Sequence, residues 1–126
     1  MIIGETLAAP LQGYTGVYFS PWFPRGGNAA IFQFDMIVAY NMSSVTVDIE
    51  TKNTEDDDKD ASSLKTETIS SPSSGTRTRI EAGANLGASA TAGFKELVRY
   101  KYALAATSGR GGFIHYRMLT PAWLSN

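Results

Sequence analysis

Apolar and polar residues alternate with a period of two along several segments of the chain, and this pattern predicts β-strands. In residues 44–52, Val45, Val47 and Ile49 alternate with polar side chains, as in an antiparallel strand with one face in water. Residues 30–40 alternate in the same way. Their predicted inward face is Phe32, Phe34, Met36 and Val38.

Two segments near the C-terminus, residues 98–104 and 113–118, alternate most clearly. One face of the two segments carries no formal charge and consists of Val98, Tyr100, Tyr102, Leu104, Ile114, Tyr116 and Met118. The opposite face consists of Arg99, Lys101, His115 and Arg117. We therefore predict a hairpin with an apolar, aromatic side for the core and a cationic side for a partner.

Turn-forming residues divide the chain into short pieces at the spacing of β-sandwiches. Weaker alternation over residues 64–69 and 76–82 predicts two further strands on either side of a turn rich in Ser, Pro and Gly. The total of about seven or eight strands predicts an all-β fold, an antiparallel β-sandwich of the jelly-roll kind.

Residues 1–29 are rich in Gly and Pro and predict an extended N-terminal arm with one short strand at 17–19. Residues 30–126 would then form the β-sandwich, and the whole chain of 126 residues is one domain. The arm carries Tyr14, Tyr18, Phe19, Trp22 and Phe23. These aromatic side chains predict that the arm packs either on its own domain or on a neighbouring molecule.

The charge is nearly balanced, with 11 basic and 12 acidic residues. A net charge of −1 argues against nucleic acid and anionic lipid as partners, because both attract basic domains. No segment approaches the roughly 20 apolar residues that span a bilayer, so a membrane location is not expected. The absence of cysteine excludes disulfides and thiol catalysis.

The charge is unevenly distributed along the chain. Residues 1–63 carry three basic and nine acidic side chains, whereas residues 64–126 carry eight basic and three acidic ones. If this division persists in space, copies of the chain could pair an acidic side with a basic side.

An acidic segment has the ligand spacing of an EF-hand loop. Counted from Asp56 as position one, Asp58, Asp60 and Glu67 fall at positions three, five and twelve. Position six, where the tight turn requires glycine, is Ala61. We therefore expect a solvated loop between two strands, with no metal and no cofactor, and keep these four acids as a candidate calcium site.

Candidate catalytic chemistry is sparse. His115 is the only histidine, and general acid–base catalysis by histidine usually needs a partner that orients the ring. None of the serines lies in a G-x-S-x-G motif. We therefore predict that the protein is not an enzyme.

A cationic strip is the candidate contact surface. Arg77 and Arg79 alternate with Thr and Ile and could extend the row of Arg99, Lys101 and Arg117. An acidic protein surface, a phosphate backbone or an acidic polysaccharide would each fit such a strip, although a solvated sheet face carries the same residues. The predicted partner-binding residues are Arg77, Arg79, Arg99, Lys101, Arg117, Tyr14, Tyr18, Trp22 and Phe23.

In size, strand pattern and the terminal sequence FIHYRMLTPAW, residues 17–123 resemble the small jelly-roll structural proteins of tailed bacteriophages, namely decoration, cement and minor capsid proteins. The resemblance implies a location in the virion and a homo-oligomer, with a trimer favoured. It also implies a non-enzymatic role in which the protein binds the capsid lattice or its own copies and clamps neighbouring subunits. The alternative function is a carbohydrate-binding β-sandwich, in which exposed aromatic rings would stack on sugars.

Overall fold

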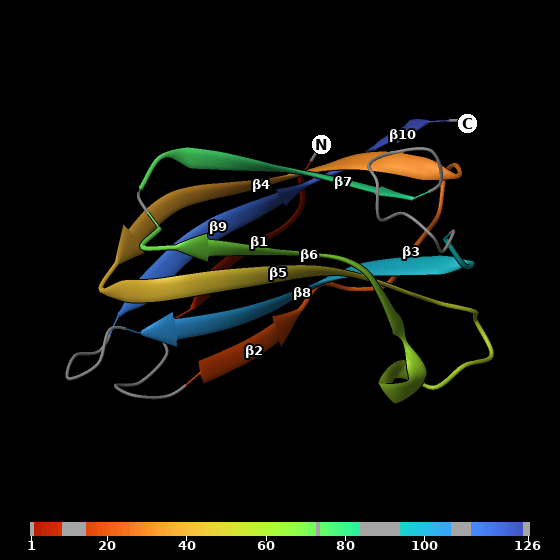
Figure 1. Ribbon diagram of the computed structural model, residues 1–126, viewed down its shortest axis with the longest axis horizontal. Helices are drawn as coiled ribbons and strands as arrows, with labels where there is room; N and C mark the ends of the chain where they lie inside the picture. Colours follow the sequence, from red (N-terminus) through yellow and green to blue (C-terminus); the bar gives the residue numbers. More distant parts are fainter. Residues whose placement is uncertain (1, 9–14, 73, 84–93, 107–111, 125–126) are drawn as a thin grey trace.

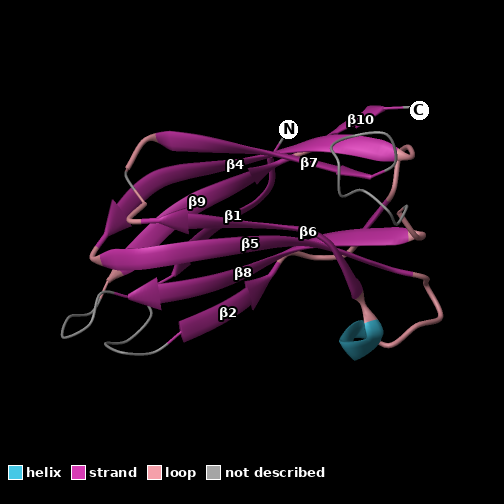
Figure 2. Cartoon of the chain, in the orientation of Figure 1, coloured by secondary structure: helices cyan, strands magenta, loops and turns pink. Residues whose placement is uncertain are grey.

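The computed structural model describes residues 2–8, 15–72, 74–83, 94–106 and 112–124 and consists of two antiparallel β-sheets packed face to face (Figure 1). The strands are β1 (Ile2–Ala8), β2 (Thr15–Phe19), β3 (Phe23–Pro24), β4 (Ala29–Tyr40), β5 (Met42–Lys52), β6 (Ser62–Ser70), β7 (Thr76–Gly83), β8 (Leu97–Ala106), β9 (Phe113–Leu119) and β10 (Ala122–Leu124). A single turn of 3-10 helix, η1 (Asp58–Asp60), precedes β6 (Figure 2). The predicted all-β sandwich is confirmed.

The first sheet has the order β1-β9-β4, and β7 pairs with the other edge of β4. The short strand β10 pairs with Ala29–Ile31, the part of β4 that lies beyond β9. The second sheet has the order β2-β8-β5-β6, with β3 pairing with β8 beyond the end of β2. All of these pairings are antiparallel, and no helix in the described part of the chain is long and apolar enough to cross a membrane.

The core lies between the two sheets and is formed by the inward members of the alternating strands. As the pattern predicts, Phe32, Phe34, Met36, Val45, Val47, Ile49, Val98, Tyr100, Tyr102, Leu104, Ile114, Tyr116 and Met118 are all buried. Val38 differs from the prediction because it is only partly buried. The pairing of β4 with β9 shifts in register between Met36 and Val38, and such a shift ends the strict alternation of faces.

Strands β8 and β9 are not a hairpin, so this prediction is wrong. β8 belongs to the second sheet and β9 to the first, and their tyrosines meet across the core. The ring centroids of Tyr102 and Tyr116 are 4.5 Å apart. A period-two pattern identifies the inward side chains of each strand, but two strands that face each other across a sandwich satisfy it as well as two neighbours in one sheet.

The predicted N-terminal arm is part of the sandwich. β1 pairs along β9, and β2 and β3 pair along β8, so the described residues before β4 contribute strands to both sheets. Ser20 fixes the chain after β2, because its backbone NH bonds to the Tyr100 carbonyl at 3.0 Å and its hydroxyl accepts from the Tyr100 NH at 2.9 Å. The sequence left open whether the arm packs on its own domain or on a neighbouring molecule. In the structure, the described residues of the arm pack on their own domain.

One core tyrosine has a hydroxyl group that no described residue satisfies. The Tyr102 hydroxyl is buried without a hydrogen-bond partner, and burial raises the pKa of this phenol far above its ordinary value of 10.0. The neighbouring Tyr100 differs, because its hydroxyl donates to the backbone oxygen of Leu119 at 3.2 Å. Its pKa is also raised by burial. The two rings are stacked, with centroids 5.9 Å apart, so they provide a matched pair.

We expect Tyr102→Phe to increase the free energy of unfolding by about 1 kcal/mol, because the variant removes a buried polar atom that has no partner. The melting temperature should rise by about 4 °C. Tyr100→Phe is the control, and it should decrease the free energy of unfolding by about 1 kcal/mol because it removes a satisfied hydroxyl. Urea unfolding followed by circular dichroism measures both changes, and a loss of stability in Tyr102→Phe would contradict the prediction.

Candidate functional site

A buried ion pair lies on the outer face of the second sheet. The alternation of β5 and β8 directs Glu50 and Arg99 away from the core, and the antiparallel register places these two residues opposite each other. Arg99 Nε donates to Glu50 Oε1 at 2.8 Å. Both residues are nevertheless buried, which is unusual for charged side chains on an outer sheet face.

Two aromatic rings account for the burial of Arg99. The guanidinium carbon lies 4.0 Å from the centroid of the Phe19 ring and 4.3 Å from that of the Trp22 ring. Phe19 ends β2, and Trp22 follows the turn at Ser20 that is bonded to β8. Cation–π contacts with a desolvated guanidinium stabilise this arrangement. One face of each ring is therefore covered by the same cation.

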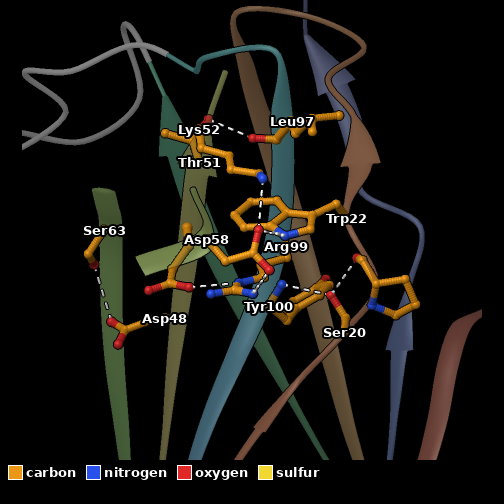
Figure 3. Close-up of polar contacts among 12 residues, drawn as sticks. Ser20, Trp22, Asp48, Thr51, Lys52, Asp58, Ser63, Leu97, Arg99 and Tyr100 are labelled. Atoms are coloured by element: carbon orange, nitrogen blue, oxygen red, sulfur yellow. Dashed lines mark hydrogen bonds and ion pairs between the residues drawn. The ribbon is translucent and has the colours of Figure 1, made fainter. Parts of the chain in front are cut away.

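A carboxylate from the loop after β5 completes the cluster (Figure 3). Asp58 Oδ1 accepts from Lys52 Nζ at 2.7 Å and from Trp22 Nε1 at 3.1 Å, and Arg99 Nη1 lies 3.7 Å from Asp58 Oδ2. The hydrogen bond from Lys52 is the main reason that the pKa of Asp58 lies below its ordinary value of 3.8. Trp22 and Arg99 lower this pKa further. We call Glu50, Lys52, Asp58, Arg99, Phe19 and Trp22 the outer-face cluster.

The loop that carries Asp58 is held by its own polar groups. Asp56 accepts from the backbone NH of Asn53 through its carboxylate at 3.0 Å and from Lys52 Nζ through its carbonyl at 2.9 Å. The backbone NH of Thr54 donates to Glu96 Oε1 at 3.0 Å. These contacts place the turn η1 above the end of β5 and orient Asp58 toward the sheet.

The candidate calcium ligands do not form a cation site in this structure. Within the described residues, no group of three or more His, Asp or Glu side chains is placed to hold a metal ion. The carboxylates of Asp56 and Asp58 bind a backbone NH and side-chain donors instead, whereas Glu67 lies on β6, opposite Val47. Asp60 ends the exposed turn η1. In this structure the EF-hand spacing therefore does not bring the four acids together.

The edge strand β2 exposes two apolar side chains beside the cluster. Val17 and Phe19 are 48% and 50% exposed. Across the second sheet, Val17 lies in one row with Ala103, Thr46 and Thr68, a row without charge. The next row contains Lys101 opposite Asp48. These two rows therefore combine an exposed apolar edge, small side chains and one charge of each sign.

The outer face of the first sheet carries a second set of charges. Arg77 donates to both carboxylate oxygens of Asp35, with Nη2 2.8 Å from Oδ2, and Arg117 pairs with Asp35 in register on the other side. The hydrogen bond from Arg77 is the main reason that the pKa of Asp35 is lowered, and the positive charges of Arg77 and Arg117 add to it. Arg79 forms an ion pair with Glu81 at 3.2 Å.

The five cations predicted as one strip are separated by the fold. Arg77, Arg79 and Arg117 lie on strands of the first sheet, whereas Arg99 and Lys101 lie on β8 of the second sheet. The prediction of a single cationic strip is therefore wrong, because it required β8 and β9 to be neighbours in one sheet. Arg99 is also buried.

The predicted aromatic contact residues have different environments. Tyr18 and Phe23 are partly buried against the core, and Trp22 belongs to the outer-face cluster. Tyr14 lies outside the described residues. Glu50, Lys52 and Phe19 were not predicted as site residues. The signal that could have found them is the alternation itself, which places Glu50 and Lys52 on the outward face of one strand and Arg99 on that of another.

The chain matches no protein-family model, no curated protein and no solved structure.

Proposed function

We propose that this protein is a non-enzymatic assembly protein that binds copies of itself through the outer face of β2, β8 and β5. We further propose that it acts as a decoration or cement protein of a phage virion, where the resulting cluster, with a trimer favoured, clamps neighbouring capsid subunits. The observation that carries the proposal is the exposed apolar edge of β2, beside an aromatic and arginine cluster that is already fixed in place.

The composition of this face supports a protein partner. Exposed aromatic and arginine residues are the usual anchors of protein interfaces, and anchors that are held rigid before binding lose less conformational entropy. Phe19 is such an anchor, because Arg99 covers one face of its ring and Glu50 fixes Arg99. Lys101 and Asp48 carry opposite charges in one row, so a second copy could place its Asp48 against Lys101.

The strand order supports the jelly-roll part of the proposal. The strands β1-β9-β4-β7 face the strands β2-β8-β5-β6, and the connections β1–β2, β4–β5, β6–β7, β7–β8 and β8–β9 each pass from one sheet to the other. Eight of the ten strands, in two such sheets, fit a jelly roll, an architecture found in viral capsid proteins and also in lectins and cupins.

Native mass spectrometry and sedimentation test the proposal. The wild type is expected at an integer multiple of 13.6 kDa. Val17→Glu places a charge on the exposed edge of β2 without touching the outer-face cluster, and we expect it to weaken self-association at least about tenfold. Tyr40→Glu is the matched control, since Tyr40 is as exposed but lies on β4 of the other sheet.

A wild type that stays at 13.6 kDa in both low and high salt would overturn self-assembly. Equal effects of the two substitutions would overturn the assignment to the β2 face. Deletion of residues 1–29 is unsuitable as a test, because it would remove strands from both sheets.

A further inference from the structure

Three groups from separate parts of the fold converge on the carboxylate of Asp58. Lys52 Nζ at the end of β5 and Trp22 Nε1 between β2 and β3 donate hydrogen bonds to it, and Arg99 Nη1 of β8 forms an ion pair with it at 3.7 Å. We propose that these three groups form a binding site for a carboxylate side chain of an acidic protein segment, and that Asp58 occupies this site in the isolated chain. This inference rests on the proposed function, because it states which chemical group a protein partner would present to this outer face.

The two cations lie on strands of the sandwich, whereas Asp58 lies on the loop after β5. The side chains of Lys52 and Arg99 are each 9% exposed, but that of Asp58 is 61% exposed. Asp58 also begins a three-residue turn, η1, in which no residue is buried. The donors are therefore fixed before binding, and the carboxylate that they hold is accessible to exchange with solvent or with a competing group.

Charge selects an anion as the replacement. Without Asp58, the site retains Lys52 and Arg99 against Glu50 alone, which leaves one positive charge in excess on largely buried side chains. A buried charge without a partner is strongly unfavourable, and the Trp22 NH would also lose its acceptor. An incoming anion would restore both interactions.

The donor arrangement favours a carboxylate over a phosphate. Lys52 and Trp22 donate to one oxygen of Asp58, and Arg99 lies nearest to the other, so two oxygens satisfy the site. The excess of one positive charge matches a monoanion. A phosphate group carries a further oxygen and more negative charge, and Glu50 beside Arg99 would repel it.

Asp58→Ala opens the site, and Asp57→Ala is the matched control. Asp57 is the adjacent exposed acid, and its side chain makes no capping hydrogen bond to η1, so its removal changes the loop charge equally but leaves the donors occupied. In about 0.3 M sodium acetate, the melting temperature of Asp58→Ala should exceed that in sodium chloride at the same concentration by about 3 °C. The wild type and Asp57→Ala should show no such difference.

A hexaglutamate peptide is the second probe and distinguishes a protein segment from a free carboxylate. We expect it to bind Asp58→Ala at least about tenfold more tightly than the wild type, measured by the change in tryptophan fluorescence, with hexalysine as the peptide control. The fluorescence change should disappear when Trp22→Phe, which retains Trp123, is combined with Asp58→Ala. Asp58→Gly, which also removes the side-chain acceptor, replaces Asp58→Ala if the latter fails to fold.

Several outcomes would overturn the proposal: equal responses of Asp57→Ala and Asp58→Ala, the absence of any acetate effect, or an acetate effect without hexaglutamate binding. None of them concerns self-association. The oligomer mass of the same samples therefore reports separately on the proposed function.

Discussion

Glu50→Ala is expected to lower the free energy of unfolding by about 3 kcal/mol, although the residue lies on the outer face of a sheet. The reason is the burial of its partner. Arg99 is enclosed by Phe19 and Trp22, and its Nε donates to Glu50 at 2.8 Å, so removal of Glu50 leaves a desolvated guanidinium without its nearest anion. Asp58, 3.7 Å from Arg99, replaces only part of this interaction, because its main hydrogen bond is to Lys52.

Asp48→Ala is the matched control for Glu50→Ala. Asp48 lies two residues earlier on β5 and on the same face, but its carboxylate accepts from the hydroxyls of Ser63 and Thr66 at the exposed side of the sheet. We expect Asp48→Ala to cost less than about 1 kcal/mol. Urea unfolding followed by circular dichroism measures the free energy of unfolding of both variants. A similar loss in the two would contradict the prediction that the burial of Arg99 makes Glu50 more important than Asp48.

A double variant separates the lost attraction from the penalty of an unpaired charge. Glu50→Met combined with Arg99→Met replaces the ion pair by two apolar side chains of similar length, which is often nearly neutral at buried sites. We expect this double variant to be more stable than Glu50→Ala. If the double variant is less stable than Glu50→Ala, the attraction within the ion pair contributes more to stability than the penalty of an unpaired Arg99.

The sequence was sufficient to predict the class of fold and the inward residues of the long strands. The alternation at Val45, Val47 and Ile49 follows from local backbone geometry, and all three side chains are buried. Val38 was misassigned because a register shift between strands depends on the partner strand, which no local pattern contains.

The pairing of strands could not be predicted in the same way. Alternation in β8 and β9 is equally compatible with neighbouring strands and with strands that face each other across the core. The structure places them in different sheets, and this placement divides the five predicted cations between two outer faces. The same limitation concealed the role of the N-terminal residues, because the strands β1 and β2 pair with β9 and β8, about 80 to 120 positions later in the chain.

The outer-face cluster was missed because its parts come from distant places in the sequence. Arg99 was predicted to be available to a partner, and Asp58 to be a solvated residue of an acidic loop. Both predictions considered only the neighbours of each residue in the sequence. In the structure, Trp22 contacts both Asp58 and Arg99, and Lys52 binds Asp58. Alternation places Glu50, Lys52 and Arg99 on the outward faces of their strands, and the register between β5 and β8 then brings them together.

Phe34→Ala is expected to have the largest effect of all, a loss of about 4 kcal/mol in the free energy of unfolding. The Phe34 ring is completely buried at the centre of the sandwich. Its centroid lies 5.2 Å from that of Tyr102 in the second sheet and 5.1 Å from that of Tyr116 in the first. Truncation therefore removes contacts with both sheets and leaves a cavity between rings whose strands are paired on both sides and cannot move inward to fill it.

Ile37→Ala is the control on the same strand. Ile37 is only partly buried and lies three residues after Phe34 on β4, beside the exposed Asp35–Arg77 pair. We expect Ile37→Ala to lower the free energy of unfolding by about 1 kcal/mol or less, because the Ile37 side chain loses few buried contacts. Urea unfolding of both variants measures the difference, provided that the free energy of unfolding depends equally steeply on urea concentration in the two. A cost for Phe34→Ala as small as that for Ile37→Ala would mean that the two sheets do not share one close-packed aromatic core, since only a core that can collapse would tolerate the loss of its central ring.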